Sequence, residues 1–312
     1  MSEEVSYTPE EVANILKISK YTVYELIKRD ELAAFHIGRK VRVDAADIEA
    51  YKRNSKNITP FTASATPPTS SSPGFPLDEG LIICGQDMTL DILTRHLERR
   101  FPQIRFLRHY IGSIDGLMAL YRGMANVVTA HLWDSDTNEY NTPYVRRMLP
   151  GHRALIINMV YRTEGFYVAK GNPKKIFTWT DLARPDLRFV NRERGSGARV
   201  LLDEQLQIQD IAHQSVNGYG NEETSHIAVA SKIARGEADV GLGIEKAAQQ
   251  VNNLDFVPLQ IERYDLVIRK EDIDKPYFQA LMSILKSGAF RNEIVGIGSY
   301  DVTRMGEVMA EV

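Results

Sequence analysis

The sequence contains a single cysteine, Cys84, so no disulfide bond can form within one chain. Cys84 lies in the apolar segment LIIC, where we expect a buried thiol on a strand rather than a reactive one. No run approaches the roughly 18 apolar residues of a membrane span, and the acidic N-terminus lacks the basic and apolar regions of a signal peptide. These absences predict a soluble, cytoplasmic protein that does not contact a membrane.

Neither sign of charge dominates the chain. Its 38 Lys and Arg residues against 41 Asp and Glu residues give a net charge of −3. A broadly basic surface is therefore excluded, and any contact with nucleic acid must come from a local patch. With 312 residues, 43% of them hydrophobic, the chain has an ordinary globular composition and is long enough for two domains.

The motifs of common enzymes are missing from the sequence. The seven histidines are scattered, no HExxH pattern occurs, and neither GxGxxG nor GxxxxGK[ST] is present. His131 and Asp134 in AHLWD could hold a metal ion, but a polar loop histidine is more often simply hydrogen-bonded. We therefore expect no enzyme activity, no bound metal and no cofactor.

A change of composition divides the chain. The segment TPFTASATPPTSSSPGFP, residues 59–76, holds five prolines and eight Ser or Thr residues in eighteen positions. Such a segment buries too little apolar surface to offset its ordering entropy, and its prolines keep it extended. We therefore predict a linker over residues 57–79, between a small domain at residues 1–56 and a large domain at residues 80–312.

The small domain begins with two short helices. In TPEEVANIL, Thr8 is expected to cap a helix, with Pro9 in its first position and Glu11 completing a capping box. After a tight turn, KYTVYELIK repeats apolar residues at helical spacing, which is the helix-turn-helix pattern. The segment AAFHIGRKVRV then alternates around Gly38 as a two-stranded hairpin does, and DAADIEAYKR returns to helix.

Basic residues concentrate on the second helix and the hairpin. Residues 17–42 contain seven Lys or Arg against three acids, a local charge of +4. Through TPEEVANIL, TVYELIKRDELAAFHIGRKVRV and ADIEAY, the small domain resembles the excisionase-type winged helix-turn-helix family, which is related to the MerR class. The resemblance implies double-stranded DNA as a partner, contacted by the second helix and the wing through Lys20, Tyr21, Thr22, Tyr24, Lys28, Arg39, Lys40 and Arg42.

The large domain alternates short apolar segments with helical ones, as in GLIICGQD followed by MTLDILTRHLERRFP. This alternation predicts parallel βαβ units and an α/β fold, in which ligands bind beyond the carboxyl ends of the strands. Four polar or glycine-rich turns stand at helix starts: GQDMTLD, IGSIDGL, RERGSGAR and NEETSH. Because helix N-termini expose unpaired N–H groups, these turns predict a shared cleft for an anion or a carboxylate-bearing molecule.

Five segments carry a second resemblance: GSIDGLMALYRG, AHLWDSDTNEYNTPYVRRMLPG, FVNRERGSGARVLLDEQL, SHIAVASKIARGEADVGLGIEKAA and LDFVPLQIERYDLVI. They are similar to the periplasmic-binding-protein-like ligand domain fused to bacterial helix-turn-helix regulators and to some molybdopterin-biosynthesis proteins. A more distant similarity is to periplasmic molybdate-binding proteins. The resemblance implies a two-lobed type II binding-protein fold that closes on its ligand, with lobe 1 at residues 80–165 and 265–312 and lobe 2 at residues 166–264.

The candidate ligand-binding residues lie in or next to the four turns and are Gln86, Asp87, Ser113, His131, Arg194, Ser196, Gly197, Thr224 and Ser225. In the related transport proteins, serine hydroxyls and backbone N–H groups hold tetrahedral oxyanions, so molybdate or tungstate is the expected effector. A small organic metabolite or cofactor is the alternative, because a buried carboxylate beside a dianion costs free energy. In that case Trp133, Tyr140 or Tyr144 would stack on the ligand.

Together the two domains predict a one-component bacterial transcription regulator that binds DNA through its small domain and senses an effector in its large one. A DNA-architectural protein of the excisionase type is the alternative, although such a protein needs no second domain of this size. A homodimer is expected, because one small domain makes few phosphate contacts whereas two share the binding load.

Replacing Arg39 and Lys40 with alanine is expected to weaken binding to double-stranded DNA, because two phosphate contacts are lost. The slope of log K against log salt concentration should flatten by roughly two units, at about 0.9 per contact. Fluorescence anisotropy of a labelled duplex over a salt series measures affinity and slope together. A folded variant with the wild-type affinity and slope would remove both residues from the DNA-binding surface.

Overall fold

The computed structural model describes residues 6–28, 32–37, 40–56 and 80–312. The chain divides into two compact units, which we call the head (residues 1–73) and the body (residues 74–312). The predicted linker, residues 57–79, lies outside the described residues. In the described part of the chain, no helix combines the length and the apolar character that crossing a bilayer demands.

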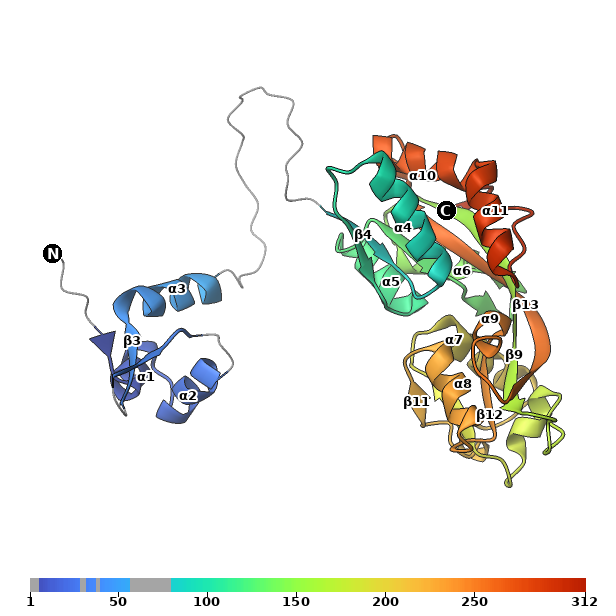
Figure 1. Cartoon of the computed structure of the whole chain (residues 1–312), viewed down its shortest axis with the longest axis horizontal. Coiled ribbons are helices and arrows are strands. Elements are labelled where there is room, and N and C mark those ends of the chain that lie inside the picture. The colour runs from blue at the N-terminus through green and yellow to red at the C-terminus, as the bar shows by residue number, and fades with distance from the viewer. Residues whose placement is uncertain (1–5, 29–31, 38–39, 57–79) are drawn as a thin grey trace. The chain divides into compact units, whose positions relative to one another are not determined.

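The described residues of the head form helices around a small antiparallel sheet (Figure 1). The helices are α1 (Pro9–Leu16), α2 (Lys20–Lys28) and α3 (Ala45–Lys56), and the strands lie in the order β1 (Ser6–Tyr7), β3 (Lys40–Asp44) and β2 (Phe35–Ile37). Thr8 and Glu11 form the predicted capping box at the start of α1. The predicted pairing of two antiparallel strands is present, with Phe35 opposite Arg42, and β1 adds a third strand because Tyr7 pairs with Val43.

One nine-stranded sheet runs through the body. Its strands, in spatial order, are β11 (Glu222–Glu223), β10 (Phe189–Arg192), β12 (Val240–Ile244), β9 (Ala154–Ala169), β13 (Leu254–Arg269), β6 (Val127–Ala130), β4 (Leu81–Cys84) and β5 (Phe106–His109), with β14 (Val308–Glu311) paired to β9. The short strands at each end pair in parallel, as βαβ units do, whereas β9 and β13 are antiparallel to each other along their whole length. A separate hairpin joins β7 (Trp133–Asp134) to β8 (Glu139–Tyr140).

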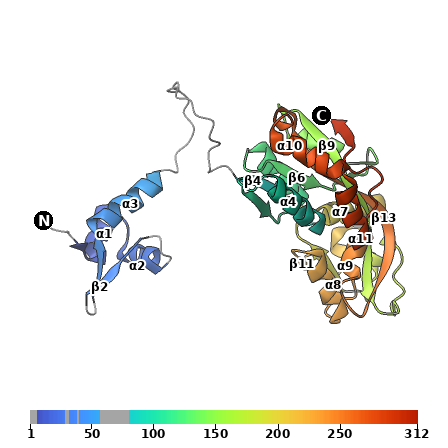
Figure 2. The ribbon, with the colours of Figure 1, turned by 45° about the horizontal axis from the view of Figure 1, so that its top comes forward.

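Helices gather in two lobes around this sheet, and β9 and β13 run through both lobes (Figures 1 and 2). Lobe 1 carries α4 (Met88–Arg100), α5 (Ser113–Tyr121), α6 (Thr142–Met148), α10 (Pro276–Lys286) and α11 (Gly288–Ile297). Lobe 2 carries α7 (Gly197–Ile208), α8 (His226–Ala234) and α9 (Glu245–Ala248). The predicted α/β architecture, a small winged helix-turn-helix domain and a two-lobed binding-protein-like domain, is confirmed.

Apolar clusters hold the helices of each lobe to both faces of the sheet. In lobe 1, Leu93 of α4 packs in one cluster and Leu117 of α5 in another. In lobe 2, the neighbouring residues Phe166 and Tyr167 of β9 belong to different clusters, the first with α7 and the second with α8. Alternation of side chains along a strand explains this division. Each lobe is therefore a sheet covered on both sides.

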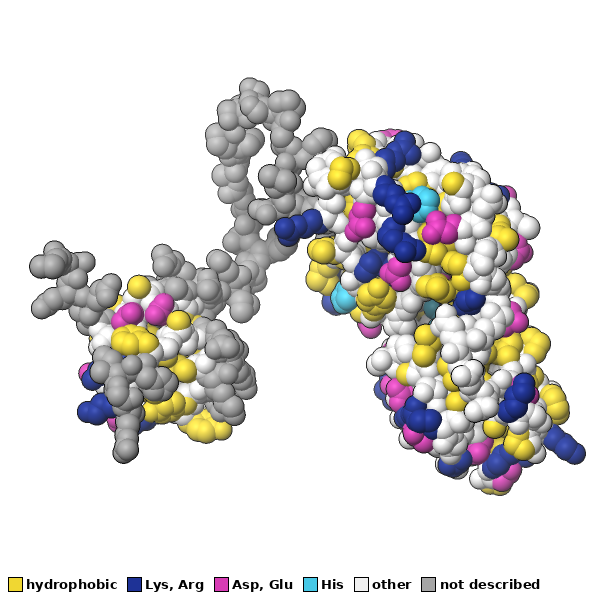
Figure 3. All heavy atoms as spheres, viewed as in Figure 1, with side chains coloured by type: hydrophobic (Ala, Val, Ile, Leu, Met, Phe, Trp, Pro, Cys, Tyr) yellow, Lys and Arg dark blue, Asp and Glu magenta, His cyan; other side chains and the backbone are white. Residues whose placement is uncertain are grey.

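Charges of both signs are interspersed on the face of the body that Figure 3 shows, in keeping with the net charge of −3. Basic side chains lie over α4, and one of them, Arg95, is 3.8 Å from a carboxylate oxygen of Glu293 on α11. Cys84 is buried in β4, and burial raises the pKa of its thiol to about 11. The expectation of a buried thiol on a strand is therefore confirmed.

Gly165→Ala is expected to destabilise the body. A Cβ atom at Gly165 would lie 2.2 Å from the carbonyl oxygen of Val257 on β13, and such overpacking costs about 1–3 kcal/mol. The matched control is Gly296→Ala in α11, where a Cβ meets nothing within 4 Å and alanine favours the helix. Urea unfolding followed by the fluorescence of Trp133 and Trp179 measures both variants. Equal stability of Gly165→Ala and wild type would contradict the expectation.

Candidate functional site

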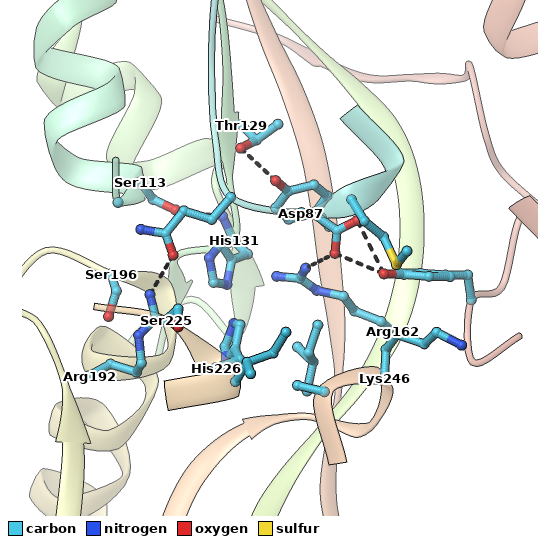
Figure 4. Close-up of a pocket in the computed structure, with 18 of the residues that line it drawn as sticks. Asp87, Ser113, Thr129, His131, Arg162, Arg192, Ser196, Ser225, His226 and Lys246 are labelled. Atoms are coloured by element: carbon cyan, nitrogen blue, oxygen red, sulfur yellow. Dashed lines mark hydrogen bonds and ion pairs between the residues drawn. The ribbon is translucent and has the colours of Figure 1, made fainter. Parts of the chain in front are cut away.

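A cavity of about 290 Å³ lies between the two lobes of the body. Its walls come from the turns after β4, β5 and β6 in lobe 1, from the starts of α7, α8 and α9 in lobe 2, and from the centres of β9 and β13 (Figure 4). The lining residues are Gln86, Asp87, Met88, Ile111, Gly112, Ser113, Thr129, His131, Arg162, Arg192, Ser196, Ser225, His226, Ile227, Ile244, Lys246, Ala247, Gln250, Tyr264 and Tyr300. The cavity thus lies beyond the carboxyl ends of the short parallel strands, where α/β folds place ligands.

The structure brings the four polar turns together at this cavity. Gln86 and Asp87 come from the first turn, Ser113 from the second, Ser196 from the third and Ser225 from the fourth (Figure 4). The N-termini of α5, α7 and α8 therefore meet at one place, and each carries a partial positive charge and unpaired N–H groups.

The serine hydroxyls at the cavity differ in what they already bind. The Ser196 hydroxyl donates to a backbone carbonyl at 2.9 Å and accepts from a backbone N–H of α7 at 3.3 Å, so capping occupies it. Ser225 accepts from a backbone N–H of α8 at 3.1 Å, and Ser113 accepts from the N–H of His131 at 3.3 Å. Among the described residues, the Ser113 and Ser225 hydroxyls have no acceptor, so both can donate to a ligand.

Three of the predicted ligand-binding residues do not line the cavity, which corrects the sequence prediction. Arg194 follows the end of β10 and points to solvent, with 85% of its side chain exposed. Thr224 is exposed and precedes the cap of α8. Gly197 is buried against the ring of His131, and a Cβ there would lie 2.3 Å from Nδ1. Gly197 therefore leaves room for the His131 ring, and no side chain of its own reaches the cavity.

The aromatic side chains at the cavity are not those that the sequence suggested. Trp133 packs in an apolar cluster of lobe 2, and the Tyr140 hydroxyl accepts a hydrogen bond from Gln260 at 2.7 Å. Tyr264 and Tyr300 line the cavity instead. Tyr144 also lies outside its wall, because its hydroxyl donates to Glu204 on α7 at 3.3 Å.

A buried ion-pair network borders the cavity at the centre of the two long strands. Arg162 on β9 donates to Asp87 at 2.5 Å and, through Nε, to Glu262, its cross-strand neighbour on β13. His131 Nδ1 lies 2.7 Å from Glu262 Oε2, and the Arg162 guanidinium lies 4.1 Å from the centre of the Tyr264 ring. Because these charges are paired, the protein tolerates their burial.

The pKa values of two glutamates at this network are shifted in opposite directions. Burial would raise the pKa of Glu262, but the charges of Arg162 and His131 outweigh burial and hold that pKa well below its usual range. Glu164 lies two residues from Arg162, on the same face of β9. Burial, and then the charge of Glu262, raises the pKa of Glu164 well above its usual range. Of the two carboxyl groups, Glu164 therefore holds a proton more readily than Glu262.

Across the cavity, lobe 2 supplies a second guanidinium and a neutral imidazole. Arg192 donates to Gln86 at 2.6 Å and, through Nε, to Glu193 at 2.7 Å. Burial, and then the charges of Arg192 and Arg162, lowers the pKa of His226 well below its usual value. The His226 ring therefore stays neutral at physiological pH.

Direct contacts join the two lobes on both sides of the cavity. On one side, Gln86 of lobe 1 meets Arg192 of lobe 2, and the N–H of Ile114 donates to the carbonyl of Gly195 at 3.0 Å. On the other side, Lys246 of α9 donates to the carbonyl of Ile297 in α11. The cavity is therefore bordered on two sides by contacts that exist only while the lobes are together.

Sequence reasoning missed the residues on the long strands. Arg162 and Glu164 stand inside the apolar segment ALIINMVYRTEGFYVA, and Glu262 stands inside LDFVPLQIERYDLVIR. Charged residues are rarely fully buried unless they are paired, so their occurrence in long apolar strands is the signal that could have found them. Lys246 and Tyr300 offer no comparable signal, because Lys246 lies in the short helix α9 and Tyr300 lies in a loop.

On the head, the predicted DNA-contacting residues fall on α2 and β3. Lys20, Tyr21, Thr22, Tyr24 and Lys28 belong to α2, Lys40 and Arg42 belong to β3, and Arg39 lies outside the described residues. Tyr21 is 75% exposed and Tyr24 is 45% exposed. Lys20 is 3.1 Å from Glu10, which is a weak surface ion pair that a phosphate can replace.

Two family models match the chain. The model of the PBP superfamily domain matches residues 94–286, and the model of a helix-turn-helix domain matches residues 6–56. The protein YvgK of Bacillus subtilis is 42% identical over 311 residues and spans 100% of both chains. A protein from the region 5′ of the 2Fe-2S ferredoxin gene of Clostridium pasteurianum is 49% identical over 113 residues, 36% of this chain and 100% of that one.

Solved structures share the fold of the body at low sequence identity. A phosphate ABC transporter substrate-binding protein from Clostridium perfringens, solved with bound phosphate, matches with a TM-score of 0.53 and 13% identity, over 72% of this chain and 99% of that one. An ABC-type phosphate transport receptor from Vibrio cholerae matches with a TM-score of 0.50 and 16% identity, over the same shares of the two chains. At these identities the likeness concerns the fold alone.

Glu164→Gln is expected to raise stability at neutral pH. The raised pKa means that the folded protein keeps a proton that the unfolded chain has lost, so wild-type stability falls as pH rises from the ordinary pKa of glutamate toward the pKa in the folded protein. Glutamine keeps the shape of the side chain and has no such proton. In urea unfolding over a pH series, the free energy of unfolding of the variant should therefore increase relative to that of wild type as pH rises. Parallel stability curves would contradict the assignment.

Proposed function

Because the chain belongs to the PBP superfamily and carries a helix-turn-helix domain, it is a ligand-binding, DNA-binding regulator, and we propose that its effector is molybdate or tungstate held in the body cavity. The observation that carries the proposal is the convergence of three helix N-termini, those of α5, α7 and α8, on one cavity. Helix N-termini attract anions through their N–H groups and their partial positive charge.

The donors at the cavity suit an oxyanion. The hydroxyls of Ser113 and Ser225 are free to donate, and Arg192, which is paired with Glu193, adds a guanidinium on the lobe 2 wall. Neutral donors suffice for a dianion when they are preoriented and shielded from water, because hydrogen bonds to charged groups are the stronger ones. The Clostridium perfringens structure holds phosphate, another tetrahedral oxyanion, so phosphate and sulfate belong in any test of selectivity.

A small organic effector is the second candidate, and one observation favours it. The carboxylate of Asp87 lines the cavity together with apolar side chains, among them Ile111, Ile227 and Tyr264. A carboxylate can accept hydrogen bonds from an organic ligand, and apolar side chains can pack on its carbon atoms. The same carboxylate opposes a dianion, although Arg162 pairs with it at 2.5 Å.

The effector is proposed to act on the contacts between the lobes. A ligand that touches both Ser113 of lobe 1 and Ser225 of lobe 2 binds more tightly when the lobes meet than when they are apart. This difference in affinity shifts the equilibrium toward the arrangement in which the lobes meet. The resulting change in the body alters how the head engages double-stranded DNA. We place the protein in the cytoplasm as a homodimer, since paired heads share the phosphate contacts.

Catalysis is not part of this proposal. A serine nucleophile needs a base within hydrogen-bond reach, and among the described residues none of the cavity serines is hydrogen-bonded to a histidine ring. The helix N-termini at the cavity can hold an anion without transforming it.

Ser225→Ala is expected to weaken oxyanion binding by about 1–3 kcal/mol, because the ligand loses a hydrogen-bond donor in the cavity between the lobes. The matched control is Ser287→Ala, since Ser287 caps α11 as Ser225 caps α8 but does not line the cavity. Both variants should lose about 1 kcal/mol of folding stability with the lost cap. Only Ser225→Ala should lose affinity. Calorimetric titration of the full chain with molybdate, tungstate, sulfate and phosphate measures this difference.

Two results of that titration would count against the proposal. Failure of all four oxyanions to bind folded wild type would exclude an oxyanion effector and favour the organic one. Equal affinity of wild type, Ser225→Ala and Ser287→Ala would show that an oxyanion binds away from the start of α8.

A further inference from the structure

Three potential metal ligands cluster behind the cavity wall. The ligand atoms of His131, Glu164 and Glu262 all lie within 4.8 Å of one another. His131 follows β6, Glu164 lies on β9 and Glu262 lies on β13, so the cluster joins lobe 1 to the two long strands. Their exposed fractions are 8%, below 1% and below 1%, which sets them apart from a solvated acidic patch.

The carboxyl group of Glu164 is buried beside that of Glu262, and no Lys, Arg or His among the described residues forms an ion pair with it. Neither of its carboxyl oxygens receives a hydrogen bond from any described residue, although the side chain is fully buried. A buried polar group without a partner costs free energy, and such groups are rare in native proteins. The two oxygens belong to the cluster with His131 and Glu262, so a bound cation would satisfy them.

The charge balance around the cluster also favours a divalent cation. The carboxyl groups of Asp87, Glu164 and Glu262 surround one guanidinium, that of Arg162. Metal ligands are bound in their deprotonated form, with histidine neutral. With the three carboxyl groups ionised and His131 neutral, the three carboxylates and Arg162 together carry two surplus negative charges, while the nearby Arg192 is already paired with Glu193. A divalent cation balances them, and a bound cation is commonly the largest local charge of a site.

We propose that His131, Glu164 and Glu262 bind a divalent transition-metal ion. One imidazole nitrogen and two carboxylates form a donor set that suits Zn²⁺, Mn²⁺ and Co²⁺ better than Ca²⁺ or Mg²⁺, which prefer oxygen alone. Metal–ligand bonds of about 2.0–2.2 Å require ligand atoms roughly 3.4 Å apart. The His131–Glu262 pair, now 2.7 Å apart, must therefore separate slightly while Glu164 moves closer.

A metal ion at this site would also affect effector binding. His131 lines the cavity, so an ion on its ring lies at the cavity wall and offsets the carboxylates that oppose a dianion. This connection rests on the proposed function, whereas metal binding itself does not. Metal binding is therefore measured first without any oxyanion.

The experiment uses the full chain freed of metal with a chelator. Calorimetric titration with Zn²⁺ and Mn²⁺ should show one ion per chain, and Co²⁺ should give visible absorption bands of a protein-bound ion. Loss of even an outer-shell partner weakens metal sites about 10–100-fold, so Glu164→Gln, which lacks one ligand, should weaken binding at least that much. The control Glu204→Gln alters a partly buried glutamate outside the cluster, which accepts from the N–H of Ser135 at 3.1 Å, and should bind as wild type does.

Each outcome decides the proposal. Site-specific binding that Glu164→Gln abolishes and Glu204→Gln keeps supports it, provided that circular dichroism shows both variants folded. Absence of tight binding by folded wild type overturns it, and so does binding that Glu164→Gln leaves unchanged. Repeating the titration with molybdate separates the two ideas, because oxyanion binding can fail while the metal still binds, and the reverse.

Discussion

The antiparallel pairing of β9 with β13 is the contact on which the rest of the body depends. The two strands pair from Ala154 opposite Arg269 to Ala169 opposite Leu254, and both lobes build their sheets onto them. At the close contact of Gly165 with β13, a side chain does not fit. The lobes are thus held by one ladder, whose register shifts between Pro258 and Gln260 and between Tyr264 and Asp265, while each lobe keeps apolar clusters of its own. Such a construction allows the lobes to move relative to each other without unfolding either one.

Charge is placed where the two strands pass between the lobes. Arg162 and Glu262 face each other across the ladder, and Asp87 completes the pairing from the start of α4. Removing charges from water costs free energy, and for these groups only their attraction to one another offsets that desolvation penalty. The arrangement is therefore sensitive to any added charge in the cavity. An anion, a proton on Glu164 or a cation at the cluster each shifts the same balance.

The contacts across the cavity suggest how binding in the body becomes a signal. Gln86 bonds to Arg192 on one side and Lys246 bonds to Ile297 on the other, so separation of the lobes breaks polar contacts at both edges. When the contact breaks, each of these groups forms hydrogen bonds with water instead. The free-energy difference between the arrangement with the lobes together and the one with the lobes apart is therefore small. A ligand of modest affinity can then govern the equilibrium, because it needs only to prefer one arrangement. In the proposed regulator, the helix-turn-helix head is the part that binds DNA.

The sequence by itself determined the features that arise from local physics. A capping box at Thr8, the alternation of strands with helices, and serines such as Ser225 at helix starts are properties of a few neighbouring residues. Because parallel strands end on one edge of a sheet, the meeting of the polar turns followed from the same local pattern. Only the tertiary structure decided which side chains of those turns enter the cavity. Arg192 faces inward and Arg194 outward, although they lie two residues apart.

The charged network was also decided by the tertiary structure alone. Arg162 and Glu262 are separated by 100 positions in the chain, and no local pattern relates them. They meet because β9 and β13 pair in one particular register, and a shift by one residue would turn each side chain to the opposite face. His131 joins them from a third element. Local sequence thus determined the elements and their caps, whereas long-range strand register determined the charges at the centre of the body.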